Sequence, residues 1–165
     1  MNTVAETLRA GIVAAFLLLS TGVAADVPDP EGWSRFRGPN GSGVSTSTRL
    51  PAEFGPDTNV VWKTELPFGH SSPALTRDRI FLTAARGERL VTICLDRRTG
   101  AILSERDAPR ARVEKLDNRN GPAGPTPATD GTNVYVFFAD FGLLSYDMAG
   151  RERWRRRWPA TSWRC

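Results

Sequence analysis

Histidine limits the chemistry open to this chain, because its 165 residues contain a single one, His70. His70 precedes Ser71 and Ser72, and a serine beside an imidazole base is a common nucleophile in acyl transfer. Successive residues of a strand point to opposite faces, however, and the sequence places no carboxylate that could orient the ring. A histidine that packs or stabilises a turn is therefore the favoured interpretation, and no triad or histidine-based metal site is predicted.

Polar residues that precede predicted inner strands are the remaining candidates for a site. His70, Asn118 and Asn120 could line a central channel. Asp140–Gly142 reads Asp-Phe-Gly, like the metal-binding triplet of kinases, but the chain has no glycine-rich phosphate loop and no His-Arg-Asp loop. We interpret this triplet as a hairpin turn. No catalytic, cofactor-binding or metal-binding residue is predicted.

The positive charge of the chain is concentrated at its C-terminal end. Residues 151–165 contain six arginines and one acid and carry a charge of +5. The net charge of the whole chain is +4, so the preceding residues sum to −1. The body therefore has no basic footprint for nucleic acid, and no nucleic-acid partner is predicted. Cys94 and Cys165 do not form a disulfide framework. Cys94 lies in an apolar run, where a buried small hydrophobe is expected.

Residues 1–25 have the three parts of a secretory signal peptide. Arg9 gives the positive flank, Gly11–Leu19 the apolar segment, and Val23-Ala24-Ala25 a small-residue cleavage site. The apolar run is short for a membrane span, although an uncleaved anchor helix remains the alternative. We expect cleavage near Ala25, a periplasmic or secreted protein, and no stable membrane insertion after cleavage.

Residues 26–58 form a Pro-, Gly- and Ser-rich arm without sustained periodicity. Trp33 and Phe36 are large apolar side chains, so we expect an ordered arm that packs both rings onto a body; a flexible linker is the alternative. Asn40-Gly41 predicts a turn within the arm.

From residue 59 the sequence changes to short β-rich runs separated by turns, and no helical stripe persists for ten residues. The predicted strands are Val60–Leu66, Ser72–Leu75, Arg79–Ala84, Leu90–Leu95 and Ala101–Glu105. The third and fourth should pair as a hairpin across residues 86–88.

An internal repeat is the most informative feature of the sequence. Residues 72–82 align with 126–136 at an offset of 54, and Leu95–Gly100 aligns with Tyr146–Gly150 with one residue deleted. Each unit holds four short strands in about 50 residues. Such a meander cannot bury both of its faces alone, whereas several packed radially can, as in a propeller.

The turn before the last strand of each unit has a physical rationale. Asp96 and Asp147 should cap it by accepting backbone hydrogen bonds, and Gly100 and Gly150 should take the positive φ. Aromatic residues late in the unit, Trp62 and Trp154, could lie across a neighbouring sheet.

These motifs resemble the pyrroloquinoline-quinone (PQQ) type of propeller repeat. In the second unit the resemblance is carried by Pro127, Ala128, Val134, Tyr135, Val136, Asp140, Gly142, Leu143, Leu144, Tyr146, Asp147, Gly150 and Trp154. The first unit has Ser104 where tryptophan is usual. Phe36–Val44, Trp62-Lys63 and Gly69–Pro73 resemble the start of a secreted bacterial subfamily whose members are named by similarity to the outer-membrane assembly lipoprotein BamB.

The resemblance implies an all-β fold, a β-propeller of four-stranded antiparallel blades. Residues 59–157 would supply about two blades plus one strand, which cannot close a ring, so an N-terminal fragment is expected. Residues 158–165 match neither unit and form an atypical tail, interpreted as truncation or a frameshift; a basic-aromatic tail for an anionic surface is the alternative. Two open blades should be marginally stable.

The resemblance implies a non-catalytic periplasmic or extracellular scaffold that presents loops to protein or polymer partners, and no cofactor is predicted. The alternative is a PQQ-dependent dehydrogenase. In that group the quinone stacks on adjacent disulfide-bonded cysteines and calcium is held by carboxylate and amide oxygens, and neither set can be assigned here. A shared fold does not by itself carry the activity.

Overall fold

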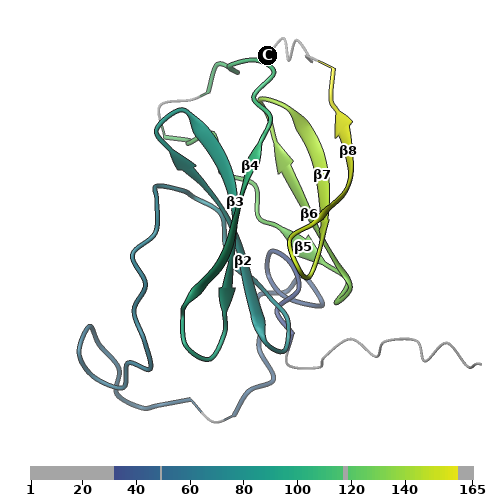
Figure 1. Cartoon of the computed structure of the whole chain (residues 1–165). Helices are drawn as coiled ribbons and strands as arrows, with labels where there is room; N and C mark the ends of the chain where they lie inside the picture. Colours follow the sequence, from purple (N-terminus) through teal and green to yellow (C-terminus); the bar gives the residue numbers. More distant parts are fainter. Residues whose placement is uncertain (1–31, 49, 117–118, 160–165) are drawn as a thin grey trace, which may run out of the picture.

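The chain folds into two four-stranded antiparallel sheets in a computed structural model that describes residues 32–48, 50–116 and 119–159 (Figure 1). The first sheet comprises β1 (Ala74–Leu75), β2 (Arg79–Arg86), β3 (Arg89–Asp96) and β4 (Ile102–Ala108). The second comprises β5 (Ala128–Thr129), β6 (Asn133–Phe138), β7 (Gly142–Asp147) and β8 (Glu152–Arg157). The all-β prediction is confirmed, and so is the assignment of four strands to each repeat unit. The predicted signal peptide and residues 160–165 of the tail lie outside the described residues.

Each sheet is a meander because short turns join strands that are neighbours in the sequence. β2 and β3 pair from Arg79↔Asp96 to Arg86↔Arg89 around a two-residue loop in which Gly87 has φ 61°. That is the left-handed region which glycine enters most easily. The predicted hairpin is therefore confirmed. No helix among the described residues is long and apolar enough to cross a membrane.

The predicted strand Val60–Leu66 is wrong. This segment bends at Val61 and forms no backbone ladder; the nearest bridge is Phe68↔Ala85. It passes beside the first sheet and is attached there by the side chains of Trp62 and Thr64. A β-rich composition favours an extended backbone, but a strand also needs a partner of matching direction and register, which the sequence does not reveal.

The two sheets stack face to face. We call the side of the first sheet that carries Phe81 its front face, the opposite side its back face, and the corresponding sides of the second sheet by the same names. The front face of the first sheet packs on the back face of the second. Phe81, Leu90 and Cys94 project from the first sheet into a core shared with Val136 and Leu144 of the second. Strand alternation sends Ile80, Val91, Ile93 and Leu95 to the opposite, back face of the first sheet, where Trp62 packs against them. Residues that align in the two repeats hold the same place in their sheets. Ile80 pairs with Leu75 in the first sheet, and the aligned Val134 pairs with Thr129 in the second, so both lie on the back face.

The N-terminal arm joins the two sheets at their short first strands, β1 and β5. The Leu75 amide donates to the Trp33 carbonyl at 2.8 Å, and the Thr129 amide donates to the Ser34 carbonyl at 2.9 Å. Trp33 is half-buried, so the arm is attached as predicted. Phe36 does not pack as predicted, because 60% of its surface is exposed.

Candidate functional site

His70 lies on the segment that leads into β1 and holds a loop of the second repeat. Its Nδ1 accepts a hydrogen bond from the Gly121 amide at 3.0 Å, and its own amide donates to the Ala123 carbonyl at 3.2 Å. Phe68 meets the ring edge-on, with centroids 4.8 Å apart. A Cβ on Gly121 would stand 2.9 Å from the Phe68 ring, so glycine allows this close approach. The interpretation as a turn-stabilising histidine is confirmed.

The serine beside His70 is also used structurally. The Ser71 hydroxyl donates to the Thr83 carbonyl at 3.1 Å and accepts from the Thr83 amide at 3.0 Å, which leaves it attached to the edge of β2. His70 and Asn120 are both exposed and flank Gly121, whereas Asn118 lies outside the described residues. A channel-lining role for His70, Asn118 and Asn120 stays a prediction. Within the described ranges, no group of three or more His, Cys, Asp and Glu residues could hold a metal ion.

Asp140 of the Asp-Phe-Gly triplet fastens the connection between the sheets. Its carboxylate is 1% exposed, accepts from Arg110 Nε at 2.7 Å and accepts from the Glu114 amide at 2.9 Å. The Phe141 amide donates to the Phe138 carbonyl, which closes the β6–β7 turn. The hairpin interpretation is confirmed, and the buried carboxylate has a structural role. The sequence did not show this ion pair, because its partners are thirty residues apart.

The turn between β3 and β4 receives side chains from residues 60–66, the segment that follows the arm. Asp96 Oδ1 accepts from the Thr99 amide at 2.8 Å, and this bond is the first cause of the lowered pKa of Asp96. Gly100 closes the turn at φ 73°. Trp62 lies on Gly100 so closely that an added Cβ would stand 2.4 Å from the indole. The indole Nε1 donates to the Arg97 carbonyl at 3.1 Å, and the Thr64 hydroxyl donates to the Gly100 carbonyl at 2.6 Å.

The turn between β7 and β8 receives the equivalent contact from β4. Asp147 Oδ1 caps this turn by accepting from the Ala149 amide at 3.0 Å, and Gly150 has φ 77°. A Cβ on Gly150 would stand 3.0 Å from the Ser104 hydroxyl. Arg106 Nε donates to the Gly150 carbonyl at 2.7 Å. Ser104 thus covers the turn glycine, and Arg106, two positions later, bonds the carbonyl of that glycine. Trp62 and Thr64 have the same two roles at Gly100. We call this arrangement the turn contact.

Several titratable groups between the sheets are buried near this second turn contact. Burial raises the pKa of the Cys94 thiol to about 11, so the thiol is protonated at neutral pH. Burial is also the first cause of the raised pKa of Tyr146, with Thr92 beside its hydroxyl acting in the opposite direction. A small cavity here is lined by Phe81, Cys94 and Ser104, among others. These groups form an apolar contact layer and supply no reactive thiolate.

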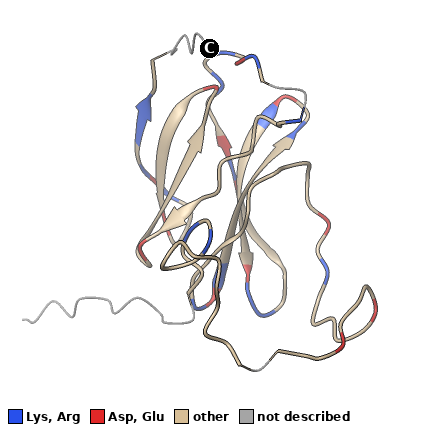
Figure 2. Ribbon diagram, turned by 180° about the vertical axis from the view of Figure 1, so that it is seen from behind, with Lys and Arg blue, Asp and Glu red and all other residues tan. Residues whose placement is uncertain are grey.

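The surface charges lie in pairs on the first sheet and as an arginine-rich strand at the edge of the second (Figure 2). Arg86 bonds Glu105 at 2.9 Å and thereby lowers the pKa of that carboxyl. On β8, Arg155 pairs with Glu152, whereas the side chains of Arg153, Arg156 and Arg157 bond no group that the structure describes. The edge strand therefore presents free guanidinium groups to solvent. Charge of this kind also disfavours edge-to-edge pairing with another sheet.

No protein-family model matches this chain, and no curated protein matches it.

Proposed function

We propose that this chain is part of a non-catalytic β-propeller scaffold of the PQQ-repeat type, acting in the periplasm or outside the cell. The observation that carries the proposal is the turn contact, which occurs once on each sheet. Thr64 bonds the Gly100 carbonyl and Arg106 bonds the Gly150 carbonyl, at 2.6 and 2.7 Å.

The way in which the sheets stack supports a radial arrangement of such units. The front of one sheet packs on the back of the next, which is a head-to-tail relation that forms a ring when its rotation closes. The short strands β1 and β5 contact one another, and inner strands of neighbouring blades do so in a propeller. A rigid ring of this kind presents its loops at fixed positions, which suits recognition of protein or polymer partners.

The inner edge is the part of this scaffold that we assign to ligand contact. His70 and Asn120 are exposed on the segments that precede β1 and β5, so they would border the central channel of a closed ring. Their imidazole and amide groups can donate and accept hydrogen bonds with a polar chain. The body carries little net charge outside residues 151–165, which favours a neutral polar partner over nucleic acid.

A PQQ-dependent dehydrogenase is the alternative function, and the residues do not fit it. The cofactor in that group rests on two adjacent cysteines, whereas Cys94 is buried, faces the second sheet and has no cysteine next to it in the sequence. Asp140, a fully buried acid, is already bonded by Arg110 and the Glu114 amide. No residue is therefore assigned to quinone, calcium or proton abstraction.

The experiment adds PQQ and calcium to the purified chain and follows dye reduction with alcohols and sugars. A known quinoprotein dehydrogenase serves as the positive control. The scaffold proposal predicts no turnover and no quinone bound after dialysis. Stoichiometric quinone binding with substrate-dependent dye reduction would contradict it.

A further inference from the structure

Asparagine followed by glycine is a dipeptide that can modify itself, and the sequence contains it twice, at Asn40-Gly41 and at Asn120-Gly121. In this reaction the amide nitrogen of the glycine attacks the side-chain carbonyl carbon of the asparagine and forms a cyclic imide. Glycine favours the attack because it has no Cβ to hinder the approach. The attacking nitrogen must lose its proton, so a base placed beside that N–H makes it a better nucleophile.

The Asn120-Gly121 pair has such a base in His70. The Gly121 N–H donates to His70 Nδ1 at 3.0 Å, which is within the reach of proton transfer to a general base. Because Nδ1 accepts this bond, it carries no proton and is the basic nitrogen of the ring. The ring is held in place, since the His70 amide donates to the Ala123 carbonyl at 3.2 Å and Phe68 meets the imidazole edge-on.

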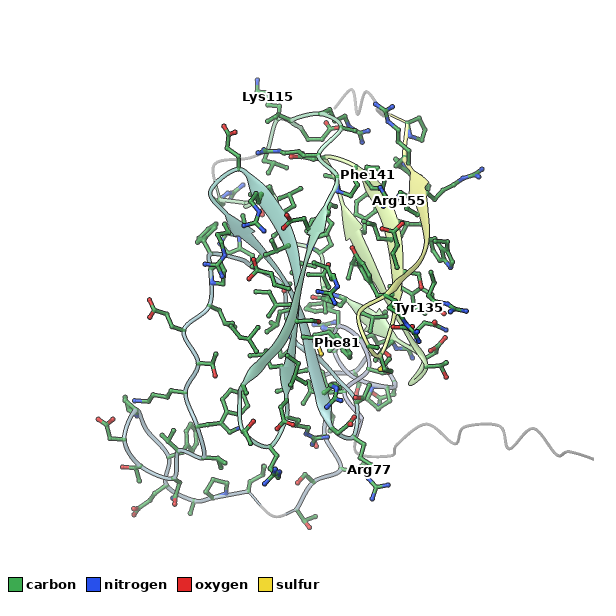
Figure 3. The ribbon with its side chains drawn as sticks, viewed as in Figure 1. Arg77, Phe81, Lys115, Tyr135, Phe141 and Arg155 are labelled. Carbon is green, nitrogen blue, oxygen red and sulfur yellow. The ribbon has the colours of Figure 1, made fainter. Side chains whose placement is uncertain are left out.

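Water, which the reaction also requires, reaches this site. His70, on the segment that leads into β1, is exposed, and so is Asn120, on the connection between β4 and β5. Lys115, on the same connection, points into solvent at one end of the molecule (Figure 3). An exposed asparagine side chain has room to turn its carbonyl carbon toward the Gly121 nitrogen, and the imide can be hydrolysed where it forms.

At Asn40-Gly41 the glycine N–H has a different acceptor. It donates to the Gly38 carbonyl at 3.1 Å, and a carbonyl oxygen does not take up a proton at neutral pH. Asn40 is exposed as well, and its Oδ1 accepts from the Ser42 amide at 3.0 Å. The two pairs therefore have similar access to water but differ in the group that accepts the glycine N–H. Asn40 is thus an internal reference for Asn120 in the same chain.

We propose that His70 is the general base for conversion of Asn120 to aspartate and isoaspartate. Nδ1 takes the proton of the Gly121 N–H as this nitrogen bonds to Asn120 Cγ. The imidazolium returns the proton to Asn120 Nδ2, which leaves as ammonia when the Cγ–Nδ2 bond breaks, so the imidazole is regenerated. Water then opens the imide: attack at Cγ breaks its bond to the Gly121 nitrogen and gives aspartate, whereas attack at the main-chain carbonyl carbon gives isoaspartate. Each chain reacts once, and no electrons are transferred.

The conversion replaces a neutral amide by a carboxylate beside the imidazole. Asn120 lies on the inner edge that we assign to ligand contact, so modified chains present a negative charge there and lose the preference for a neutral polar partner. This consequence rests on the proposed function, whereas the reaction itself does not.

The test incubates the folded full-length chain at neutral pH and follows both asparagines by mass spectrometry of tryptic peptides. Trypsin cuts after Arg37 and Arg119, so Asn40 and Asn120 fall in separate peptides, and each conversion adds the mass difference between an amide and a carboxylic acid. Asn120 is expected to convert about ten-fold faster than Asn40, which is part of what a positioned general base contributes, because hydroxide gives both residues a parallel route. In urea, which separates His70 from Gly121, the two rates should become similar.

His70→Asn is the variant that separates the base from the loop contact. An amide oxygen near the position of Nδ1 can accept the Gly121 N–H but does not take up its proton. With circular dichroism as the check that the variant is folded, His70→Asn is expected to slow conversion of Asn120 by about ten-fold and to leave Asn40 unchanged. A histidine that merely restrains the loop would give the opposite result, because a looser loop lets Asn120 reach the reacting geometry more often.

Three results would overturn the proposal. They are equal rates for Asn40 and Asn120 in the folded wild-type chain, a ratio of these rates that persists in urea, and folded His70→Asn chains in which Asn120 converts as fast as before or faster. The first two comparisons need no variant, so they decide the question even where His70→Asn does not fold. Quinone turnover would refute the proposed function and leave these rates unchanged.

Discussion

Replacing Gly100 by alanine should destabilise the chain much more than the same change at Gly87. Both glycines have positive φ, 73° and 61°, so both alanines have a similar backbone cost of about 1 kcal/mol. At Gly87 a Cβ meets no atom within 4 Å, whereas at Gly100 it meets the Trp62 indole at 2.4 Å and the Thr64 hydroxyl at 2.7 Å. The two variants therefore separate backbone strain from the loss of the turn contact.

The extra cost at Gly100 can be estimated from the interactions that must be displaced. Moving the indole and the hydroxyl breaks two hydrogen bonds worth about 1 kcal/mol each. Lost packing of Trp62 on the turn adds about 1 kcal/mol. We expect Gly100→Ala to lower the free energy of unfolding by about 4 kcal/mol and Gly87→Ala by about 1 kcal/mol.

The assay is urea unfolding followed by far-ultraviolet circular dichroism, combined with a double-mutant cycle. In a Trp62→Ser background there is no indole to displace, so the cost of Gly100→Ala should fall by about 2 kcal/mol towards that of Gly87→Ala. Equal costs for the two alanine variants in the wild-type background would refute the reasoning. A coupling energy near zero between Trp62 and Gly100 would refute it as well.

Two further predictions concern the interior of the chain. Asp140→Ala should lower the free energy of unfolding by about 3 kcal/mol, because it leaves the Arg110 guanidinium without its buried partner. In the same urea titration, Glu105→Ala, which removes an exposed pair, should lower it by under about 1 kcal/mol. Similar losses for the two variants would contradict the structural role of Asp140. Burial raises the pKa of Cys94 from 9.0 to about 11, so as the pH rises the unfolded chain releases the thiol proton before the folded chain does. The free energy of unfolding should therefore be constant below pH 9 and fall by about 2 kcal/mol as the pH rises to 11. Urea midpoints of wild-type and Cys94→Ala chains between pH 8 and 11 measure this contribution, and parallel curves would contradict it.

The sequence predicted the hairpins well because their information is local. Short, largely apolar runs in Arg79–Ala84 and Leu90–Leu95 flank a loop containing Gly87, and the structure pairs them as a hairpin. The capping by Asp96 was predictable for the same reason, since aspartate bonds the backbone only two or three residues away.

Contacts between distant segments could be predicted only where the repeat supplied them. The expectation that Trp62 lies across a neighbouring sheet is confirmed by its position on Gly100. The ion pair of Asp140 with Arg110 was not predicted, because neither residue belongs to a local motif that names the other. Phe36 was expected to pack, but hydrophobicity alone does not show which face of a turn meets the body.

The candidate site was only partly accessible to sequence reasoning. A structural role for His70 followed from the lack of a suitable partner, but its acceptor bond to the Gly121 amide depends on tertiary structure. The turn contact was foreseen for tryptophan, whereas Thr64 and Arg106 were not considered. Their common role depends on a shared carbonyl acceptor rather than on a shared side chain.

The central claim is that the same turn contact occurs twice, and a nuclear Overhauser spectrum of the isotopically labelled chain tests it most directly. The account predicts cross-peaks from the Trp62 indole to the Gly100 α-protons and from the Ser104 β-protons to the Gly150 α-protons. The close approach of these groups in the structure is the basis of both. Cross-peaks at only one of the two glycines, or at neither, would contradict the account.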